Sequence, residues 1–199
     1  MTGTAAAYDE VTGAILTGGK SSRLGRDKAL LPLGGKPLAA HMHTLLADLF
    51  SKVILIGHSR PELEDMGLTS VPDLIPGRGV LGGIYTALHV CKTPYAFIVA
   101  ADMPFLTPSV ISGVAVYRHK ADAVIPIGPK GMEPLCAVYS KACTGTIVKS
   151  IERNALKILE ALDGLKILSP EIGQKDSEPD PFININHPED LIFLGNDDS

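Results

Sequence analysis

Three continuous apolar runs, each followed by a loop, are the feature that most restricts the fold of this 199-residue chain. The runs cover residues 14–17, 53–56 and 95–101, which read AILT, VILI and YAFIVAA. Apolar side chains at nearly every position are typical of strands that are buried on both faces, as in parallel sheets covered by helices. Because helical patterns separate these runs, the sequence predicts one open, mostly parallel sheet with helices on both faces.

The spacing of apolar residues predicts the other elements. Helices are expected over residues 37–50, 84–91, 108–119 and 146–162. Shorter strands are expected over residues 71–73, 123–127, 135–140, 165–168 and 182–185. We expect a single domain over residues 13–194, with flexible tails at 1–12 and 195–199.

Charge and cysteine content exclude several classes of protein. The formal net charge is −4, which does not favour binding to nucleic acid or to a membrane surface, and no apolar stretch is long enough to span a bilayer. Five basic residues nevertheless fall within residues 20–36, where Asp27 is the only acid, as expected for a small anionic ligand. The three cysteines show no metal-binding spacing, and the N-terminus does not resemble an export signal, so we expect a cytoplasmic protein.

The segment GGKSSRLGRDK follows the first apolar run and combines glycines with basic side chains. Gly18 and Gly19 allow a tight turn with exposed backbone amides. Amides together with Arg23 and Lys28 suit a polyanion such as a nucleoside triphosphate. A glycine turn alone is common after a strand, and surface cations often only face solvent. The combination with Gly25 at this spacing is what favours phosphate binding.

Two familiar phosphate-binding loops are absent. Gly19, Lys20 and Ser21 match the end of a P-loop, but its first glycine would have to stand at Ala14. The glycine spacing also fails the G-x-G-x-x-G fingerprint of dinucleotide-binding folds. The chain is therefore predicted to be neither a P-loop NTPase nor a nicotinamide-dependent dehydrogenase.

Asp102 is the first carboxylate after the most apolar run. Ligands of an open parallel sheet bind beyond the carboxyl ends of its strands, so Asp102 and Gly18 are expected at the same edge. A carboxylate there suits Mg²⁺, which takes one or two carboxylates and completes its coordination with phosphate and water. The structural alternative is that Asp102 caps the helix that begins near Pro108.

Two further segments carry candidate ligand residues. Asp73 opens DLIPGRGVLGG and could accept hydrogen bonds from a ribose or a base, although Pro76 and Gly77 could equally form a simple turn. Asn184 and Asn186 are two residues apart, which places them on one face of a strand. Asparagine is unfavourable in strands, so this pair indicates a ligand, or a turn into a helix over 188–194.

These segments together resemble the MobA-like nucleotidyltransferases. The motifs LTGGKSSRLGRDKALLPLGGKPL, DLIPGRGVLGGIYTAL, AADMPFL, EPLCAVY and FININHPEDL occur in that family's order over residues 13–194. The resemblance implies a three-layer αβα sandwich with a Rossmann-like sheet of the nucleotide-diphospho-sugar transferase type. It is strongest to the molybdenum cofactor guanylyltransferases, which transfer GMP from GTP to the terminal phosphate of molybdopterin, with Mg²⁺, and release pyrophosphate.

The same resemblance implies partners and residue roles. Besides GTP and molybdopterin, it implies contacts with other proteins of molybdenum cofactor biosynthesis and with molybdoenzyme chaperones, for a monomer or weak homo-oligomer. The implied nucleotide-binding residues are Leu16, Thr17, Gly18, Gly19, Arg23, Lys28, Asp73 and Asp102. Of these, Arg23, Lys28 and Asp102 are the implied catalytic residues, and Asp102 also holds the metal. Asn184 and Asn186 are the implied pterin-binding residues.

Two positions depart from the family pattern. Thr17 stands where the family has an alanine, which is a conservative change because the loop backbone does the binding. The family's asparagine after the second strand is not recognisable, since His58, Ser59 and Arg60 stand there, and that contact is left unassigned.

Related activities remain as alternatives. Sister enzymes use CTP with the same pterin, or a sugar phosphate or phospholactate as acceptor, and share both the glycine loop and the strand-end aspartate. The paired glycines, the sequence at 26–28 and the NINHPEDL ending favour guanylyl transfer. A catalytically silent nucleotide-binding protein is the third alternative, and the retention of Arg23, Lys28 and Asp102 argues against it.

Overall fold

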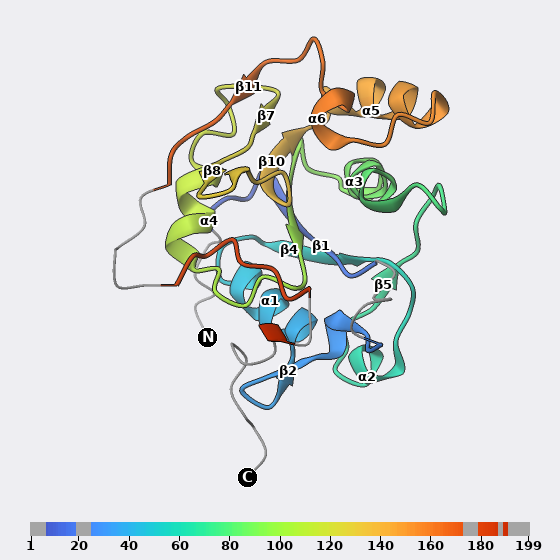
Figure 1. The fold of residues 1–199 in the computed structure, drawn as a ribbon, viewed down its shortest axis with the longest axis vertical. Coiled ribbons are helices and arrows are strands. Elements are labelled where there is room, and N and C mark those ends of the chain that lie inside the picture. Colours follow the sequence, from blue (N-terminus) through green and yellow to red (C-terminus); the bar gives the residue numbers. More distant parts are fainter. Residues whose placement is uncertain (1–6, 19–24, 173–178, 187–188, 191–199) are drawn as a thin grey trace.

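The computed structural model describes residues 7–18, 25–172, 179–186 and 189–190. Within these residues, a seven-stranded sheet has the order β11-β7-β10-β6-β1-β4-β5 and is flanked by helices (Figure 1). The strands of this sheet are β1 (Val11–Leu16), β4 (Lys52–Ile56), β5 (Ser70–Val71), β6 (Tyr95–Ala100), β7 (Ala123–Val124), β10 (Cys136–Ser140) and β11 (Ile167–Leu168). Two small hairpins lie outside it: β2 (Pro32–Leu33) with β3 (Lys36–Pro37), and β8 (Ile127–Gly128) with β9 (Gly131–Met132).

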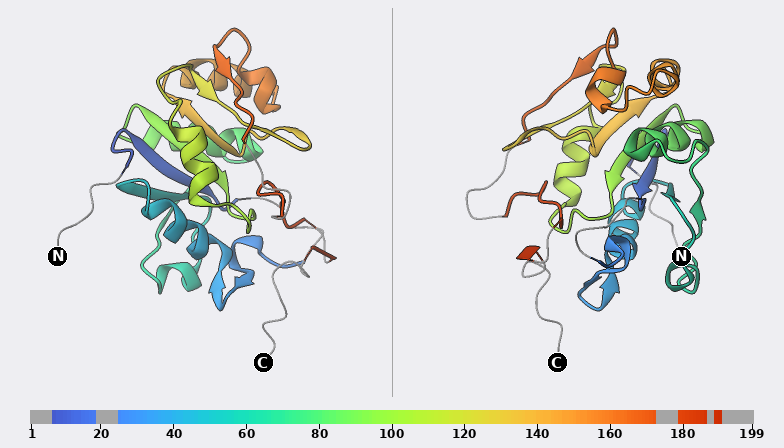
Figure 2. Two further views of the ribbon diagram at one scale, coloured as in Figure 1. Left: turned by 90° about the vertical axis from the view of Figure 1, so that its left-hand side faces the viewer. Right: turned by 45° about the vertical axis from the view of Figure 1, so that its right-hand side comes forward.

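Helices connect most of the strands, and those near residues 37–50, 84–91 and 108–119 are the ones that the sequence predicts. The helices are the 3₁₀ helix η1 (Lys28–Leu30) and the α-helices α1 (Leu38–Ala47), α2 (Pro61–Glu64), α3 (Gly79–Val90), α4 (Pro108–Ala115), α5 (Cys143–Glu152) and α6 (Ile158–Ala161). Helices α1 and α4 pack on one face of the sheet, and α3 and α5 pack on the other (Figures 1 and 2). The predicted three-layer αβα sandwich is therefore confirmed.

The central strands are apolar throughout because each face of the sheet has its own core. Phe97 and Val99 of β6 lie in the core beneath α1 and α4, whereas Ala96 and Ile98 lie in the core beneath α3 and α5. This arrangement is the physical reason for the continuous apolar runs in the sequence.

Strand directions place several loops at one edge of the sheet. Strand β1 pairs in parallel with β4 and β6, with Leu16 opposite Ile56 and Ala100. Strand β10 is antiparallel to β6 and β7, an exception within the mostly parallel sheet. Because of this reversal, the segment before β10 meets the carboxyl end of β6, where Ala100 N donates to Leu135 O at 3.1 Å.

Helix α3 begins earlier than the sequence predicts. It starts at Gly79, so Gly82 and Gly83 lie inside it rather than before it. A Cβ at Gly83 would lie only 3.2 Å from the Leu16 side chain. The glycine therefore allows α3 to pack closely against β1.

The prediction of one helix over 146–162 is wrong. Helix α5 ends at Glu152, Asn154 has a positive φ of 57°, and α6 begins at Ile158. Asparagine tolerates this left-handed conformation better than most residues. Apolar spacing continues across the break because both helices contribute residues to the same core, among them Ile151 and Ala161.

The strand predicted over 182–185 is also absent. Phe182 and Ile185 are buried, but in two different clusters, and the segment is a loop. Its apolar alternation reflects docking onto the domain, where Ile185 N donates to Asp102 O at 3.0 Å.

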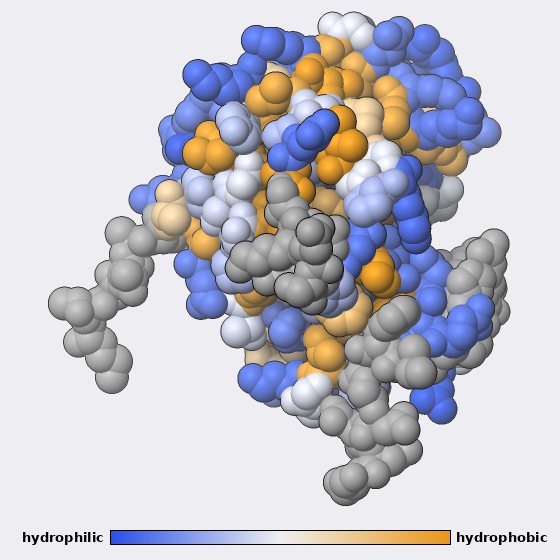
Figure 3. All heavy atoms as spheres, turned by 60° about the vertical axis from the view of Figure 1, so that its left-hand side comes forward, coloured by the Kyte–Doolittle hydropathy of each residue, from blue (hydrophilic) through white to orange (hydrophobic). Residues whose placement is uncertain are grey.

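The remaining elements are present with shifted ends. Helix α4 stops at Ala115, and β1 already begins at Val11, inside the segment expected to be a tail. Polar and apolar residues are interspersed on the face shown in Figure 3. None of the helices in the described part of the chain combines the length and the apolar character that a bilayer span requires.

Candidate nucleotide-binding site

The carboxyl ends of β1 and β6 bring two candidate segments together. Ala101 N donates to Leu16 O at 3.1 Å, so Gly18 and Asp102 follow neighbouring strands at one edge of the sheet. This is the arrangement expected from the sequence. Gly19 and Arg23 lie outside the described residues.

Lys28 is the first residue of η1 and connects three distant parts of the chain. Its Nζ lies 2.9 Å from Asp102 Oδ2 and donates to Asn186 Oδ1 at 2.7 Å. The Lys28 and Asp102 side chains are 22% and 17% exposed, so water screens their ion pair only in part. A cation and an anion thus lie side by side at the carboxyl edge of the sheet.

Asp102 does not cap helix α4, the structural alternative considered for it. Thr107 is the N-cap, and its side chain accepts a hydrogen bond from Val110 N. In the described residues no group of three or more His, Cys, Asp or Glu side chains could hold a metal by itself. A single carboxylate such as that of Asp102 is compatible with Mg²⁺, which takes one or two carboxylates and completes its coordination with phosphate and water.

Asp73 lies two residues beyond β5, beside the start of the glycine loop. Its Oδ2 is 3.9 Å from the position that a Cβ on Gly18 would occupy, and its Oδ1 is 3.8 Å from the same position on Gly83. Burial raises the pKa of the Asp73 carboxyl above its usual value. The position gives a hydrogen-bond acceptor close to the loop backbone.

Leu16 and Thr17 reach the site mainly through their backbone. The Leu16 side chain packs in the core beneath α3. Both the backbone N and the hydroxyl of Thr17 donate to Ile56 O, at 2.9 and 3.0 Å. The hydroxyl is therefore held within the protein. The expectation that threonine is a conservative change from alanine, because the loop backbone does the binding, stays a prediction.

Arg60 is the residue that the sequence analysis left without a role. It is only 3% exposed and pairs with Asp27, with 2.6 Å between Nε and Oδ2. Burial alone would raise the pKa of the Asp27 carboxyl, but the hydrogen bonds and charge of Arg60 outweigh it, and the pKa is lowered. The one signal in the sequence was its position, shortly after the second apolar run.

Asn184 and Asn186 do not share a strand face. The Asn184 side chain donates to Phe182 O at 3.1 Å, within its own loop, whereas the Asn186 side chain accepts from Lys28. Asn186 N donates to Asp190 Oδ2 at 2.7 Å, which agrees with a turn starting at Asn186. The helix expected over 188–194 lies almost wholly outside the described residues.

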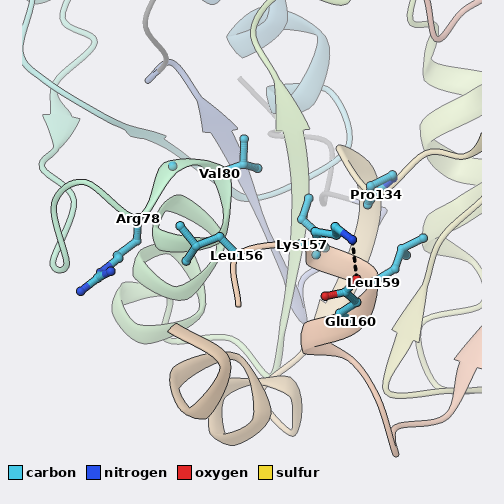
Figure 4. Close-up of a pocket in the computed structure, with 9 residues that line it drawn as sticks. Arg78, Val80, Pro134, Leu156, Lys157, Leu159 and Glu160 are labelled. Carbon is cyan, nitrogen blue, oxygen red and sulfur yellow. Dashed lines mark hydrogen bonds and ion pairs between the residues drawn. The ribbon is translucent and has the colours of Figure 1, made fainter. Parts of the chain in front are cut away.

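A pocket of about 600 Å³ lies beside the first turn of α3 (Figure 4). Its walls are apolar, from Val80, Pro134, Leu156 and Leu159, and Lys157 contributes an amine that pairs with Glu160. Arg78 borders it, and its guanidinium extends away to donate to Asn154 Oδ1. Pro134 directly precedes Leu135, whose carbonyl accepts a hydrogen bond from Ala100 N at the end of β6. The pocket therefore lies at the same edge of the sheet as Asp102.

Comparison with known proteins identifies the family. A family profile described as "MobA-like NTP transferase domain" matches residues 13–165. The chain belongs to this family.

Curated relatives of this MobA-like NTP transferase align over almost its full length. A protein of Desulfosudis oleivorans named "Molybdenum cofactor guanylyltransferase" is 33% identical over 189 residues, 92% of this chain and 93% of the relative. One of Pelotomaculum thermopropionicum, named "Probable molybdenum cofactor guanylyltransferase", is 33% identical over 186 residues, 92% and 91% of the two chains.

Solved structures of similar proteins share the fold. The molybdopterin-guanine dinucleotide biosynthesis protein A of Archaeoglobus fulgidus superposes with a TM-score of 0.78 at 27% identity, covering 92% of this chain and 96% of that one. The 2-C-methyl-D-erythritol 4-phosphate cytidylyltransferase of Thermus thermophilus has a TM-score of 0.66 at 17% identity, covering 91% and 95%, which shows a common fold alone.

Proposed function

We propose that this MobA-like NTP transferase is a molybdenum cofactor guanylyltransferase, which transfers GMP from GTP to the terminal phosphate of molybdopterin and releases pyrophosphate. The observation that carries the proposal is full-length similarity, above 30% identity, to proteins of that name. Under this proposal, GTP and molybdopterin are the substrates, other proteins of cofactor synthesis and molybdoenzyme chaperones are partners, and the cytoplasm is the location.

The residues at the sheet edge support a direct in-line transfer. The Gly18 amide, Arg23 and Lys28 would bind the triphosphate, and Asp73 would accept hydrogen bonds from the guanosine. Asp102 would hold Mg²⁺, which supplies positive charge that offsets the charge of the phosphates. Because the pterin phosphate attacks the α-phosphorus directly, the protein has only to position the reactants and neutralise charge on the departing pyrophosphate.

The pocket beside α3 is our proposed place for the acceptor. Its apolar walls suit a flat ring system, and Lys157 suits an anionic group on the same molecule. Asn186, which contacts Lys28, would also meet the acceptor. Asn184 stays a predicted pterin-binding residue, although its amide here donates within its own loop.

The test is an assay of the purified protein with molybdopterin, Mg²⁺ and each of GTP, CTP, ATP and UTP, followed by pyrophosphate release. We expect release with GTP and formation of the guanine dinucleotide product, and none with the Asp102→Asn variant. Release with CTP alone would establish the sister cytidylyltransferase activity instead. No release with any nucleotide would refute the proposal in both forms.

A further inference from the structure

A buried arginine holds both ends of the loop between β1 and η1. Arg60 precedes α2 and lies outside this loop. It hydrogen-bonds to Thr17 at the start of the loop and to Asp27 at its end. The fifth bond goes to His58 O at 2.9 Å, so all five N–H donors of the guanidinium are engaged.

At the first end, Arg60 fixes the orientation of one peptide group. Nη2 donates to Thr17 O at 2.7 Å, and Nη1 donates to the Thr17 hydroxyl at 3.0 Å. The described chain contains no cis peptide bond, and in a planar trans peptide the N–H points opposite to the carbonyl. Holding the Thr17 carbonyl on Arg60 therefore directs the Gly18 N–H away from the arginine.

At the second end, Arg60 fixes the helix turn that carries Lys28. The Asp27 carboxylate accepts from Nε at 2.6 Å and from Nη2 at 3.2 Å. The same carboxylate accepts from Ala29 N at 3.0 Å and so caps η1, whose first residue is Lys28. The position of the Lys28 backbone is thus tied to Arg60 through one acidic side chain.

We propose that Arg60 is a positioning residue that sets the Gly18 amide and the Lys28 amine at the separation a triphosphate requires. At 3% exposure its guanidinium is engaged with the protein, so it acts through Thr17 and Asp27. Lysine cannot replace it, because a single ammonium cannot supply the planar fork that reaches two partners in fixed geometry. The inference rests on the proposed function only in that the loop binds a triphosphate.

Inorganic triphosphate with Mg²⁺ is the probe that isolates this role, because it carries neither base nor acceptor. We expect Arg60→Met and Arg60→Lys to weaken triphosphate binding, measured by calorimetry, by about tenfold or more, the usual effect of losing charge-assisted hydrogen bonds. With GTP and molybdopterin, kcat should fall as well as KM rise, because Lys28 is displaced even in the saturated enzyme.

Arg118→Met is the matched control. Arg118 is also a largely buried arginine, with an ion pair to Glu10 and its guanidinium over the Tyr8 ring, near the start of β1. Its removal should lower the melting temperature while triphosphate affinity and kcat stay unchanged. Assays are run well below the melting temperature of every variant, and Arg60→Lys serves if Arg60→Met does not fold.

A double-mutant cycle with Asp27→Asn completes the test. If Arg60 acts through Asp27, Arg60→Lys and Asp27→Asn together should weaken triphosphate binding little more than either change alone. The inference would be overturned if folded Arg60 variants kept wild-type triphosphate affinity and kcat. It would also be overturned if the effects of Arg60→Lys and Asp27→Asn on triphosphate binding were fully additive. If the wild type binds triphosphate but transfers no nucleotide, the proposed function fails and this inference is still tested.

Discussion

The Lys28 ammonium lies 2.9 Å from the Asp102 carboxylate, although the two residues are 74 positions apart. The pair joins the end of the glycine loop to the end of the most buried strand. Within the protein, each group neutralises the other. A triphosphate with its metal would offer both groups a new partner of opposite charge.

The pair predicts a competition between Lys28 and the metal for Asp102. Lys28→Met should increase the affinity for Mn²⁺, used as a spectroscopic substitute for Mg²⁺, in the absence of nucleotide, because the carboxylate loses its internal partner. Asp102→Asn should abolish this binding. Equal Mn²⁺ affinity in the wild type and in Lys28→Met would show that the lysine does not compete.

Removing the Asp102 charge should stop turnover without unfolding the protein. Asparagine has nearly the same shape, and the Asp102 carbonyl that accepts from Ile185 N is retained. We expect kcat to fall below detection, a loss of at least about 10²- to 10³-fold, as when a charge-stabilising group is removed from an active site. Circular dichroism and the melting temperature check the fold, and substantial activity of Asp102→Asn would remove this residue from the mechanism.

Asp73 predicts a pH dependence of GTP binding. Burial raises its pKa, and the ionised form is the one that accepts hydrogen bonds from guanosine, so affinity should fall as the pH drops through this raised value. Asp73→Asn should weaken GTP binding about tenfold or more and remove this dependence. Titrations of GTP binding from pH 4 to 8 measure this dependence. The control is Asp65→Asn, which removes an exposed carboxylate.

Asp73 also leads us to expect a pH dependence of stability, opposite in direction to that of GTP affinity. Because the folded-state pKa lies above the unfolded value, ionisation of Asp73 disfavours the fold, and unfolding free energy falls as the pH rises through that pKa. Asp73→Asn should therefore raise the melting temperature at pH 7 while it weakens GTP binding. A lower melting temperature would contradict burial as the cause of the shift.

Gly57 should tolerate no side chain. Its φ is +144°, and a Cβ would lie 2.7 Å from Thr17 Oγ1 and 3.0 Å from Gly18 N. Gly57→Ala should destabilise the protein by about 1–3 kcal/mol and weaken triphosphate binding at the Gly18 amide. Adding Thr17→Ala should restore only part of the stability, since the contact with Gly18 N remains. Denaturant unfolding of the single and double variants tests this.

The pocket beside α3 predicts a selective effect on the acceptor. Leu159→Asp places a charge on an apolar wall, and Lys157→Ala removes its amine. Both should raise KM for molybdopterin about tenfold while leaving the affinity for GTP unchanged. A rise in the GTP KM instead, at constant molybdopterin KM, would show that the pocket serves the nucleotide.

The sequence predicted the edge of the sheet well because strand ends follow a simple rule. Gly18 and Asp102 each follow a continuous apolar run, and parallel strands place their carboxyl ends together. The wrong predictions over residues 146–162 and 182–185 have a common cause. Apolar spacing indicates which residues are buried, but it does not indicate how their backbone is hydrogen-bonded. Buried apolar residues flank the break at Asn154, and the loop at Ile185 also buries apolar side chains, so helix-like and strand-like spacings arise there without one helix or a strand.

Arg60 and the Thr17 hydroxyl were missed for a different reason. Arginine and threonine are usually exposed, and their spacing carries no signal when they are buried singly. Only the folded contacts show that one arginine meets both ends of a loop. The contact between Asn186 and Lys28 was also not predicted, because the two residues lie 158 positions apart.

The contacts of residues 185 and 186 with Asp102 and Lys28 also have a consequence for biosynthesis. The central strands leave the ribosome before these residues do. A nascent chain can therefore assemble its sheet before the polar centre is complete. The contacts that Asp102 and Lys28 make with residues 185 and 186 then form only after the central strands are already available to pair.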